Sequence, residues 1–115
     1  MQITIVTDMM TKRALEEIAR DQFGDMVKAV VDVEKSILAV GGELHADEEA
    51  VLIENGSRQE NLWGINLYPE KSPDEWIEFT SMINVRPAQN NRSRSVEDAS
   101  IQEKIRTLVN KLIPQ

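Results

Sequence analysis

Residues 27–34 constrain the fold most strongly, because their side chains alternate with the period of a β-strand. Small or β-branched apolar residues occupy every second position, at Val27, Ala29, Val31 and Val33. A second apolar run follows at 37–40, and a turn near Ser36 separates the two runs. Alternation of this kind predicts a strand with one buried face. Two such runs joined by a short turn predict a β-hairpin.

Helical signals mark two further segments. Thr11 is a suitable N-cap for a helix whose apolar residues share one face, and Gly24 is well placed to close that helix. Asp98 precedes a stripe with the spacing i, i+4, i+7 and i+11, formed by Ile101, Ile105, Leu108 and Leu112. This spacing is typical of an amphipathic helix. The chain is therefore expected to carry one helix early and another at its end.

The remaining segments supply one more helix and three more strands. Residues 47–55 favour a short helix with Asp47 as N-cap, although the β-branched residues in this segment would also suit a strand. Residues 3–6 and 62–68 are predicted strands, and 76–85 is predicted as one bent strand or two short ones.

The order of these elements, β-α-β-β-α-β-β-α, predicts an α+β fold. Strands that occur in adjacent pairs between separated helices favour a largely antiparallel sheet of about five strands with the helices packed on one face. A length of 115 residues favours a single domain over residues 1–115, because one hydrophobic core accounts for a chain of this size.

Composition narrows the classes of function. With 20 acidic against 13 basic residues the net charge is -7, which makes nucleic acid an unlikely partner because phosphate neutralisation supplies most non-specific affinity. The absence of cysteine excludes disulfides and thiolate nucleophiles. No apolar run is long enough to span a membrane and no leader segment is recognisable, so we expect a cytoplasmic protein with no membrane partner.

A local reversal of charge is the most informative candidate for binding. Arg86, Arg92 and Arg94 fall within nine positions that contain no acid, and Asn91 adds neutral hydrogen-bonding groups beside them. Guanidinium groups match phosphate or carboxylate, and the loop leads into a helix N-terminus that favours an anion. We predict that these four residues bind a small anionic ligand, such as a nucleotide or a phosphorylated metabolite. The alternative is that the arginines pair with acids of this chain and anchor the loop.

A protein partner is the rival prediction from a different class of function. The basic loop would then dock on an acidic surface of a partner or of a second copy of this chain, as a non-catalytic interaction module or homodimer. Charge complementarity would set the specificity and the association rate.

His45 and Glu43 are the candidates for catalysis. Glu43, His45 and Asp47 occupy alternate positions, so on an extended backbone their side chains would share one face. His45 would act as the base of a hydrolase or transferase if the arginine loop lay beside it. The structural alternative is a hydrogen-bonded histidine and an Asp47 that caps a helix. We predict no metal site, and the sequence identifies no cofactor and leaves open whether the protein is an enzyme.

Four sequence blocks together resemble a known family. They are Gly-Gly-Glu-Leu-His-Ala-Asp at 41–47, Leu-Trp-Gly-Ile-Asn at 62–66, Ser-Met-Ile-Asn-Val-Arg-Pro at 81–87 and Asn-Arg-Ser-Arg at 91–94. The chain resembles a family of small prokaryotic proteins known only as a domain of unknown function, which tends to have Gly at the position of Asn90. The resemblance implies a stand-alone cytoplasmic protein and carries over no reaction, cofactor or substrate.

Overall fold

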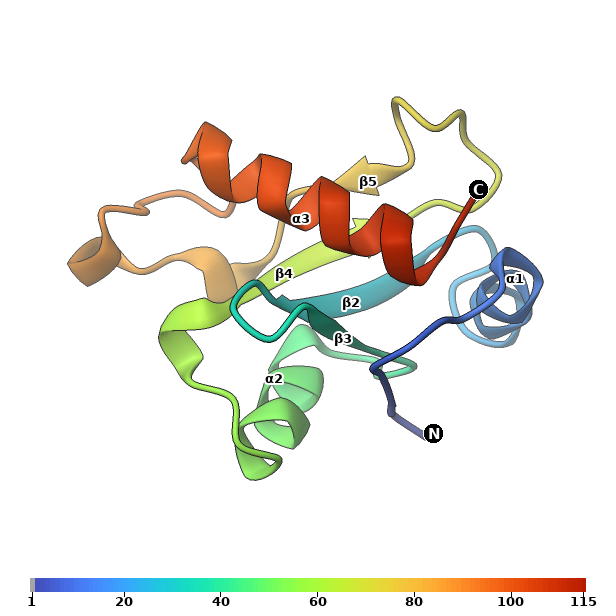
Figure 1. Cartoon of the computed structure of the whole chain (residues 1–115), viewed down its shortest axis with the longest axis horizontal. Helices are drawn as coiled ribbons and strands as arrows, with labels where there is room; N and C mark the ends of the chain where they lie inside the picture. Colours follow the sequence, from blue (N-terminus) through green and yellow to red (C-terminus); the bar gives the residue numbers. More distant parts are fainter. Residues whose placement is uncertain (1) are drawn as a thin grey trace.

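An antiparallel sheet with three helices forms the molecule (Figure 1). The computed structural model describes residues 2–115. The elements are β1 (Thr4–Val6), α1 (Lys12–Asp21), β2 (Val27–Asp32), β3 (Ile37–Val40), α2 (His45–Glu54), β4 (Leu62–Leu67), β5 (Ile77–Glu78) and α3 (Ala99–Leu112). Their order and the α+β class confirm the prediction. Among residues 2–115, no helix has the length and apolar character needed to cross a membrane.

The five strands lie in the order β1-β3-β2-β4-β5, and every neighbouring pair is antiparallel. The predicted hairpin is β2–β3, in which Val31 pairs with Leu38. The longest pairing joins β2 to β4, from Val27 with Leu67 to Asp32 with Leu62. The first strand of the chain therefore lies at one edge of the sheet and β5 at the other.

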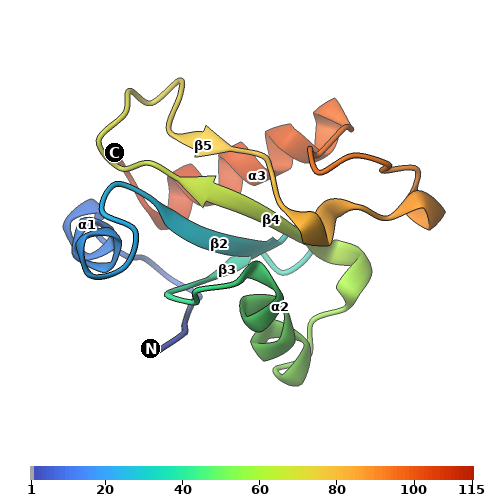
Figure 2. The same ribbon diagram turned by 180° about the vertical axis from the view of Figure 1, so that it is seen from behind.

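Helices cover both faces of the sheet, so the prediction that they pack on one face is wrong. α1 and α3 pack on the face that carries Val27, Ala29 and Val31, whereas α2 packs on the opposite face against Val30 and other residues (Figures 1 and 2). The reason lies in the strands, because β2 and β4 are buried along nearly their whole length. An apolar second face must be covered as well.

The segment between β3 and β4 is a helix, which settles the choice between helix and strand. α2 begins at His45 and its N-cap is Leu44, so Asp47 lies inside the first turn and is not the cap. The side chains that α2 turns toward the rest of the fold are His45, Glu48, Glu49 and Leu52. Three of these four are ionisable, which is unusual for the buried stripe of a helix.

Candidate functional site

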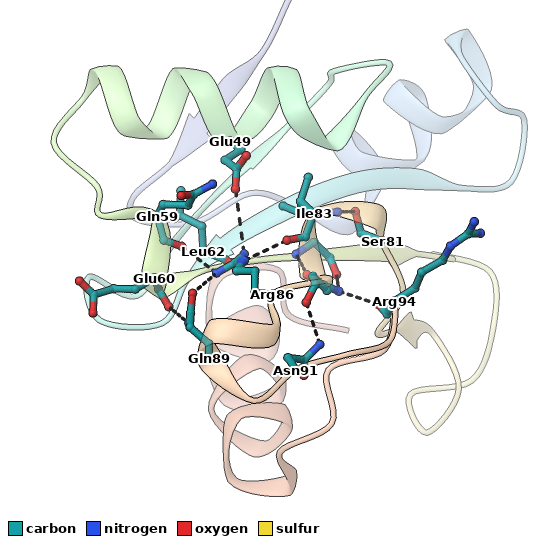
Figure 3. A network of polar contacts seen from close by, with 12 residues as sticks. Glu49, Gln59, Glu60, Leu62, Ser81, Ile83, Arg86, Gln89, Asn91 and Arg94 are labelled. Carbon is teal, nitrogen blue, oxygen red and sulfur yellow. Dashed lines mark hydrogen bonds and ion pairs between the residues drawn. The ribbon is translucent and has the colours of Figure 1, made fainter.

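Arg86 lies within the fold, and its donors are used inside the chain (Figure 3). Nε donates to the carbonyl oxygen of Ile83 (2.9 Å), Nη1 to Gln59 O (2.8 Å) and Gln89 Oε1 (3.3 Å), and Nη2 to Leu62 O. Glu49 Oε2 lies 4.0 Å from Nη2, and the guanidinium carbon lies 4.7 Å from the centre of the Trp63 ring. Burial lowers the pKa of Arg86, and Glu49 opposes that effect. Arg86 therefore ties the start of β4 to the 82–91 segment.

Asn91 is also turned inward. Its Nδ2 donates to Asn84 O (2.7 Å), Ser93 O (3.1 Å) and Ser95 O (2.8 Å), and its Oδ1 accepts from the backbone N–H of Glu97 (2.9 Å). Asn91 is 3% exposed. A loop without large apolar side chains is thus held in one shape by its own polar groups.

Asn84 continues this network into the sheet. Its Oδ1 accepts from Gly64 N (2.8 Å) and its Nδ2 donates to Gly64 O (3.0 Å), as the backbone of a neighbouring strand would. A Cβ at Gly64 would lie 2.5 Å from the Cβ of Ser81, so only glycine allows the loop this close to β4.

Carboxylates of this chain occupy the helix N-terminus that the sequence suggests for an anion, and also two backbone N–H groups of the loop before it. Glu97 Oε2 accepts from the backbone N–H groups of Arg92 (3.1 Å) and Ser93 (2.8 Å), and hydrogen bonds from Ser93 lower the pKa of Glu97. Asp98 caps α3 by accepting from Ser100 N (2.8 Å) and Ile101 N (3.4 Å). The favourable positions exist, but the fold uses them internally.

Two arginines of the loop remain exposed at its surface. We call residues 92–94 the basic tip, since Arg92 and Arg94 are exposed, and the Arg94 side chain points away from the buried network (Figure 3). Asn90, just before the tip, has φ 61° and ψ 26°. Asn and Gly are the residues that adopt this left-handed conformation most easily, so Asn90 fits this turn without the strain that most other side chains would cause.

His45 does not join the arginine loop. Its Nε2 lies 2.8 Å from Ile65 O. Because a carbonyl only accepts, Nε2 carries the hydrogen and Nδ1 is the basic nitrogen. Burial lowers the pKa of His45, which makes the ring neutral at pH 7. Among residues 2–115, no hydrogen bond or ion pair connects His45 to Arg86, Asn91 or the basic tip.

Glu43, His45 and Asp47 do not share one face, because a helix begins at His45. Glu43 lies in the preceding loop and lines a groove beside α1, while His45 is turned toward β4. Within the described residues 2–115, no group of three His, Asp or Glu side chains could hold a metal ion.

Glu48 is the unusual residue that the sequence does not reveal. It is fully buried, and desolvation raises its pKa to about 9, so the carboxyl group is protonated at pH 7. Oε2 accepts from Gly42 N (3.0 Å), and Oε1 has no hydrogen-bond partner within residues 2–115. The only sequence signal is its position three residues after His45 and four before Leu52. Because Glu48 stands in a run of acids, the sequence indicates a residue exposed to solvent.

Several hollows lie outside the arginine loop. The first, which we call the α3 groove, lies between the β2–β3 turn and α3 and has a volume of about 460 Å³. It is lined by Val33, Ser36, Glu103, Lys104, Thr107, Leu108 and Lys111.

The second hollow, which we call the α1 groove, has a volume of about 500 Å³. It is lined by Gln2, Thr4, Ile18, Asp21, Gln22, Gly41 and Glu43. A smaller hollow of about 310 Å³ shares Asp21, Gln22 and Glu43 with it and extends to Phe23 and Leu44. The α1 groove and this smaller hollow thus form one surface, with acidic residues in the shared part and Phe23 and Leu44 at one end.

Comparison with known proteins identifies a family but no characterised relative. No curated protein and no solved structure matches the chain. A family sequence model does match, over residues 4–112, and this range includes all the blocks on which the resemblance rests. The chain belongs to the family described as "Protein of unknown function (DUF5674)".

Proposed function

We propose that the protein binds a small organic anion, one that joins an apolar body to a phosphate or carboxylate, in the α3 groove. The observation that carries this proposal is a pair of lysines above an apolar floor in a chain of net charge -7. Among residues 2–115, neither Lys104 nor Lys111 has a hydrogen bond, and Lys104 interacts electrostatically with Asp98, which contributes to the lowered pKa of Asp98. A volume of about 460 Å³ also suits a small molecule.

The helix α3 presents one wall of this groove. Lys104, Thr107, Leu108 and Lys111 have the spacing i, i+3, i+4 and i+7, which places them on one helical face. Two turns separate the lysines, so their Cα atoms lie about 10 Å apart at a rise of about 1.5 Å per residue. Both ammonium groups can reach an anionic group held between them, near the Thr107 hydroxyl.

The opposite wall is fixed before any ligand arrives. Asp32 Oδ1 accepts from the N–H groups of Glu34 and Lys35 (both 2.9 Å), and Ser57 Oγ donates to Asp32 Oδ2 (2.6 Å). Lys35 is drawn away from the groove, because its Nζ donates to Gly56 O at 2.9 Å. A wall that is already ordered costs little entropy on binding.

The local charge of the groove is positive. Glu103 is the only acid in the lining, and Arg106 Nη1 lies 2.6 Å from its Oε1. Arg106 therefore offsets the charge of Glu103. Lys111 is left to act on a ligand, together with the part of the Lys104 charge that Asp98 does not offset. Distant acids contribute little, since the Debye length is about 8 Å at physiological salt. The arginine loop is the weaker candidate because its anion positions already hold Glu97 and Asp98.

Calorimetric titration tests this proposal with three probes: adenosine monophosphate, octyl phosphate and inorganic phosphate. We expect at least one of the organic phosphates to bind more tightly than inorganic phosphate, because only they use both the lysines and the floor of Val33 and Leu108. The double variant Lys104→Gln/Lys111→Gln should weaken that binding by about tenfold or more, which corresponds to about 1.4 kcal/mol.

Lys12→Gln/Arg13→Gln is the matched control, since it also removes two positive charges, from the start of α1 and away from the groove, and should leave affinity unchanged. Failure of both organic phosphates to bind below about 1 mM would contradict the proposal. Equal binding to the double variant and to the wild-type protein would contradict it as well.

A further inference from the structure

We propose that the ligand of the α3 groove is a phosphate monoester, and that the hydroxyl group of Ser36 selects it by donating a hydrogen bond to a phosphate oxygen. This inference rests on the proposed function. It adds the kind of anionic group that the ligand carries and the residue that recognises this group. Ser36 lies in the β2–β3 turn, which forms the wall of the groove that faces α3.

The backbone of Ser36 has a conformation that suits glycine. Its φ is 55°, and the other residues with positive φ among 2–115 are Gly24, Gly41, Gly56 and Asn90. Glycine adopts this conformation without steric cost and asparagine adopts it easily, whereas other side chains are strained. Ser36 is therefore the exception to a rule that the chain otherwise follows.

The turn itself needs the backbone conformation but not the serine side chain. Asp32 O accepts from Ser36 N (2.9 Å), and Ile37 then pairs with Asp32 across the hairpin. A last loop residue in the left-handed conformation is a common way to return a hairpin to its second strand. Glycine would close the same turn without strain, so the side chain of Ser36 has no evident role in the fold.

The hydroxyl group of Ser36 is free to bind a ligand. It makes no hydrogen bond among residues 2–115, and the residue is exposed. Ser36 lines the α3 groove together with Lys104, Thr107 and Lys111, which belong to the other wall. The Thr107 hydroxyl also lacks a hydrogen bond within the described part of the chain. The groove thus presents two unused hydroxyl groups, one from each wall, beside two ammonium groups.

These donors match a phosphate monoester better than a carboxylate. The three terminal oxygens of a phosphate monoester point in different directions, so they can accept from both walls at once, whereas a carboxylate is planar and has only two oxygens. A phosphate monoester also carries a charge of about -1.5 to -2 at pH 7, and it gains more from two lysines than a singly charged group does. Among residues 2–115, no arginine lines the groove to bind a planar carboxylate through paired hydrogen bonds.

Calorimetric titration tests the inference by comparing each organic phosphate with its carboxylate analogue. The pairs are octyl phosphate with nonanoate, and adenosine monophosphate with adenosine carboxylate. We expect the phosphate that binds more tightly to exceed its analogue by about tenfold or more in affinity. Ser36→Gly should weaken the binding of that phosphate by about tenfold, which is the scale of one hydrogen bond to a charged group.

Thermal unfolding of the same variants separates recognition from a role in the turn. Ser36→Gly should raise the melting temperature by about 4 °C, because it relieves the strain. Ser36→Ala keeps the strain and loses the hydroxyl, so it should weaken binding to the same extent without this gain in stability. Ser72→Gly is the control, since it removes a hydroxyl from another exposed turn and should leave affinity unchanged.

The outcomes distinguish this inference from the proposed function. If a carboxylate analogue binds as tightly as its phosphate, or if both Ser36 variants keep wild-type affinity, the inference is wrong while the groove remains an anion site. A less stable Ser36→Gly would also overturn it, because the serine would then serve the turn. Failure of both organic phosphates to bind would overturn the proposed function together with the inference.

Discussion

Glu48→Gln is expected to stabilise the protein at pH 8 and to change its stability little at pH 4. The Glu48 carboxyl group titrates near 4.5 in the unfolded chain and near 9 in the fold. Between these values the folded chain holds a proton that the unfolded chain has released. The stabilisation from the protonated group is therefore complete below about pH 4.5 and is lost as pH rises toward 9. Glutamine resembles the protonated acid but does not titrate.

Chemical denaturation at several pH values measures this effect. At about 1.4 kcal/mol for each pH unit, the loss in the wild-type protein is on the order of 5 kcal/mol, and Glu48→Gln should remove most of it. Glu54→Gln is the matched control, because it makes the same change at an exposed position of α2 and should keep the wild-type pH dependence. Parallel pH profiles for wild type and Glu48→Gln would show that Glu48 is ionised in the fold.

Arg86→Lys is expected to destabilise the protein by about 3 kcal/mol, although the charge is retained. One ammonium group cannot reach the carbonyl oxygens of Gln59, Leu62 and Ile83 together, and it loses the stacking on Trp63. Carbonyl groups inside the fold would then lack a donor, which costs the desolvation of each unpaired group.

The exposed Arg94→Lys provides the comparison for Arg86→Lys and should change stability by less than about 0.5 kcal/mol. Urea denaturation of both variants measures the difference. If Arg86→Lys kept wild-type stability and instead weakened anion binding, Arg86 would be a ligand residue as the sequence predicts, and not an anchor.

Local periodicity explains why the order of elements could be predicted. The spacing of apolar residues in 99–112 and the capping Asp98 are local signals, and the structure confirms them. Which face of the sheet each helix covers cannot be predicted from local sequence patterns. Val30 lies at a position that alternation assigns to the outer face, and it is buried only because α2 crosses that face. No pattern within β2 indicates where α2 packs.

The burial of Glu48 and the contacts of Glu97 were even less predictable from local patterns. Asp47, Glu48 and Glu49 are three consecutive acids, and nothing in the sequence distinguishes them. Glu48 is buried because the helix begins at His45, which turns Glu48 toward the sheet. Glu97 lies just beyond the acid-free segment that holds the arginines. It accepts from the backbone N–H groups of Arg92 and Ser93 only because the loop folds back, and no local pattern indicates that conformation.

Only one wall of the α3 groove could be predicted from a local sequence pattern. The spacing of Lys104 and Lys111 is visible in the sequence, since seven residues of a helix return to the same face. The turn that faces them is more than sixty residues earlier and comes to α3 only through packing of the sheet. The groove could therefore not be predicted from either segment alone.

Amide chemical shifts in a titration with adenosine monophosphate and with octyl phosphate test the central claim most directly, because they locate the bound anion. If the α3 groove binds a small organic anion, at least one of the two probes should move the signals of Ser36, Lys104, Thr107 and Lys111 first and leave those of the basic tip unchanged. Shifts confined to Arg92, Ser93 and Arg94, or no shift with either probe at millimolar concentration, would contradict the claim.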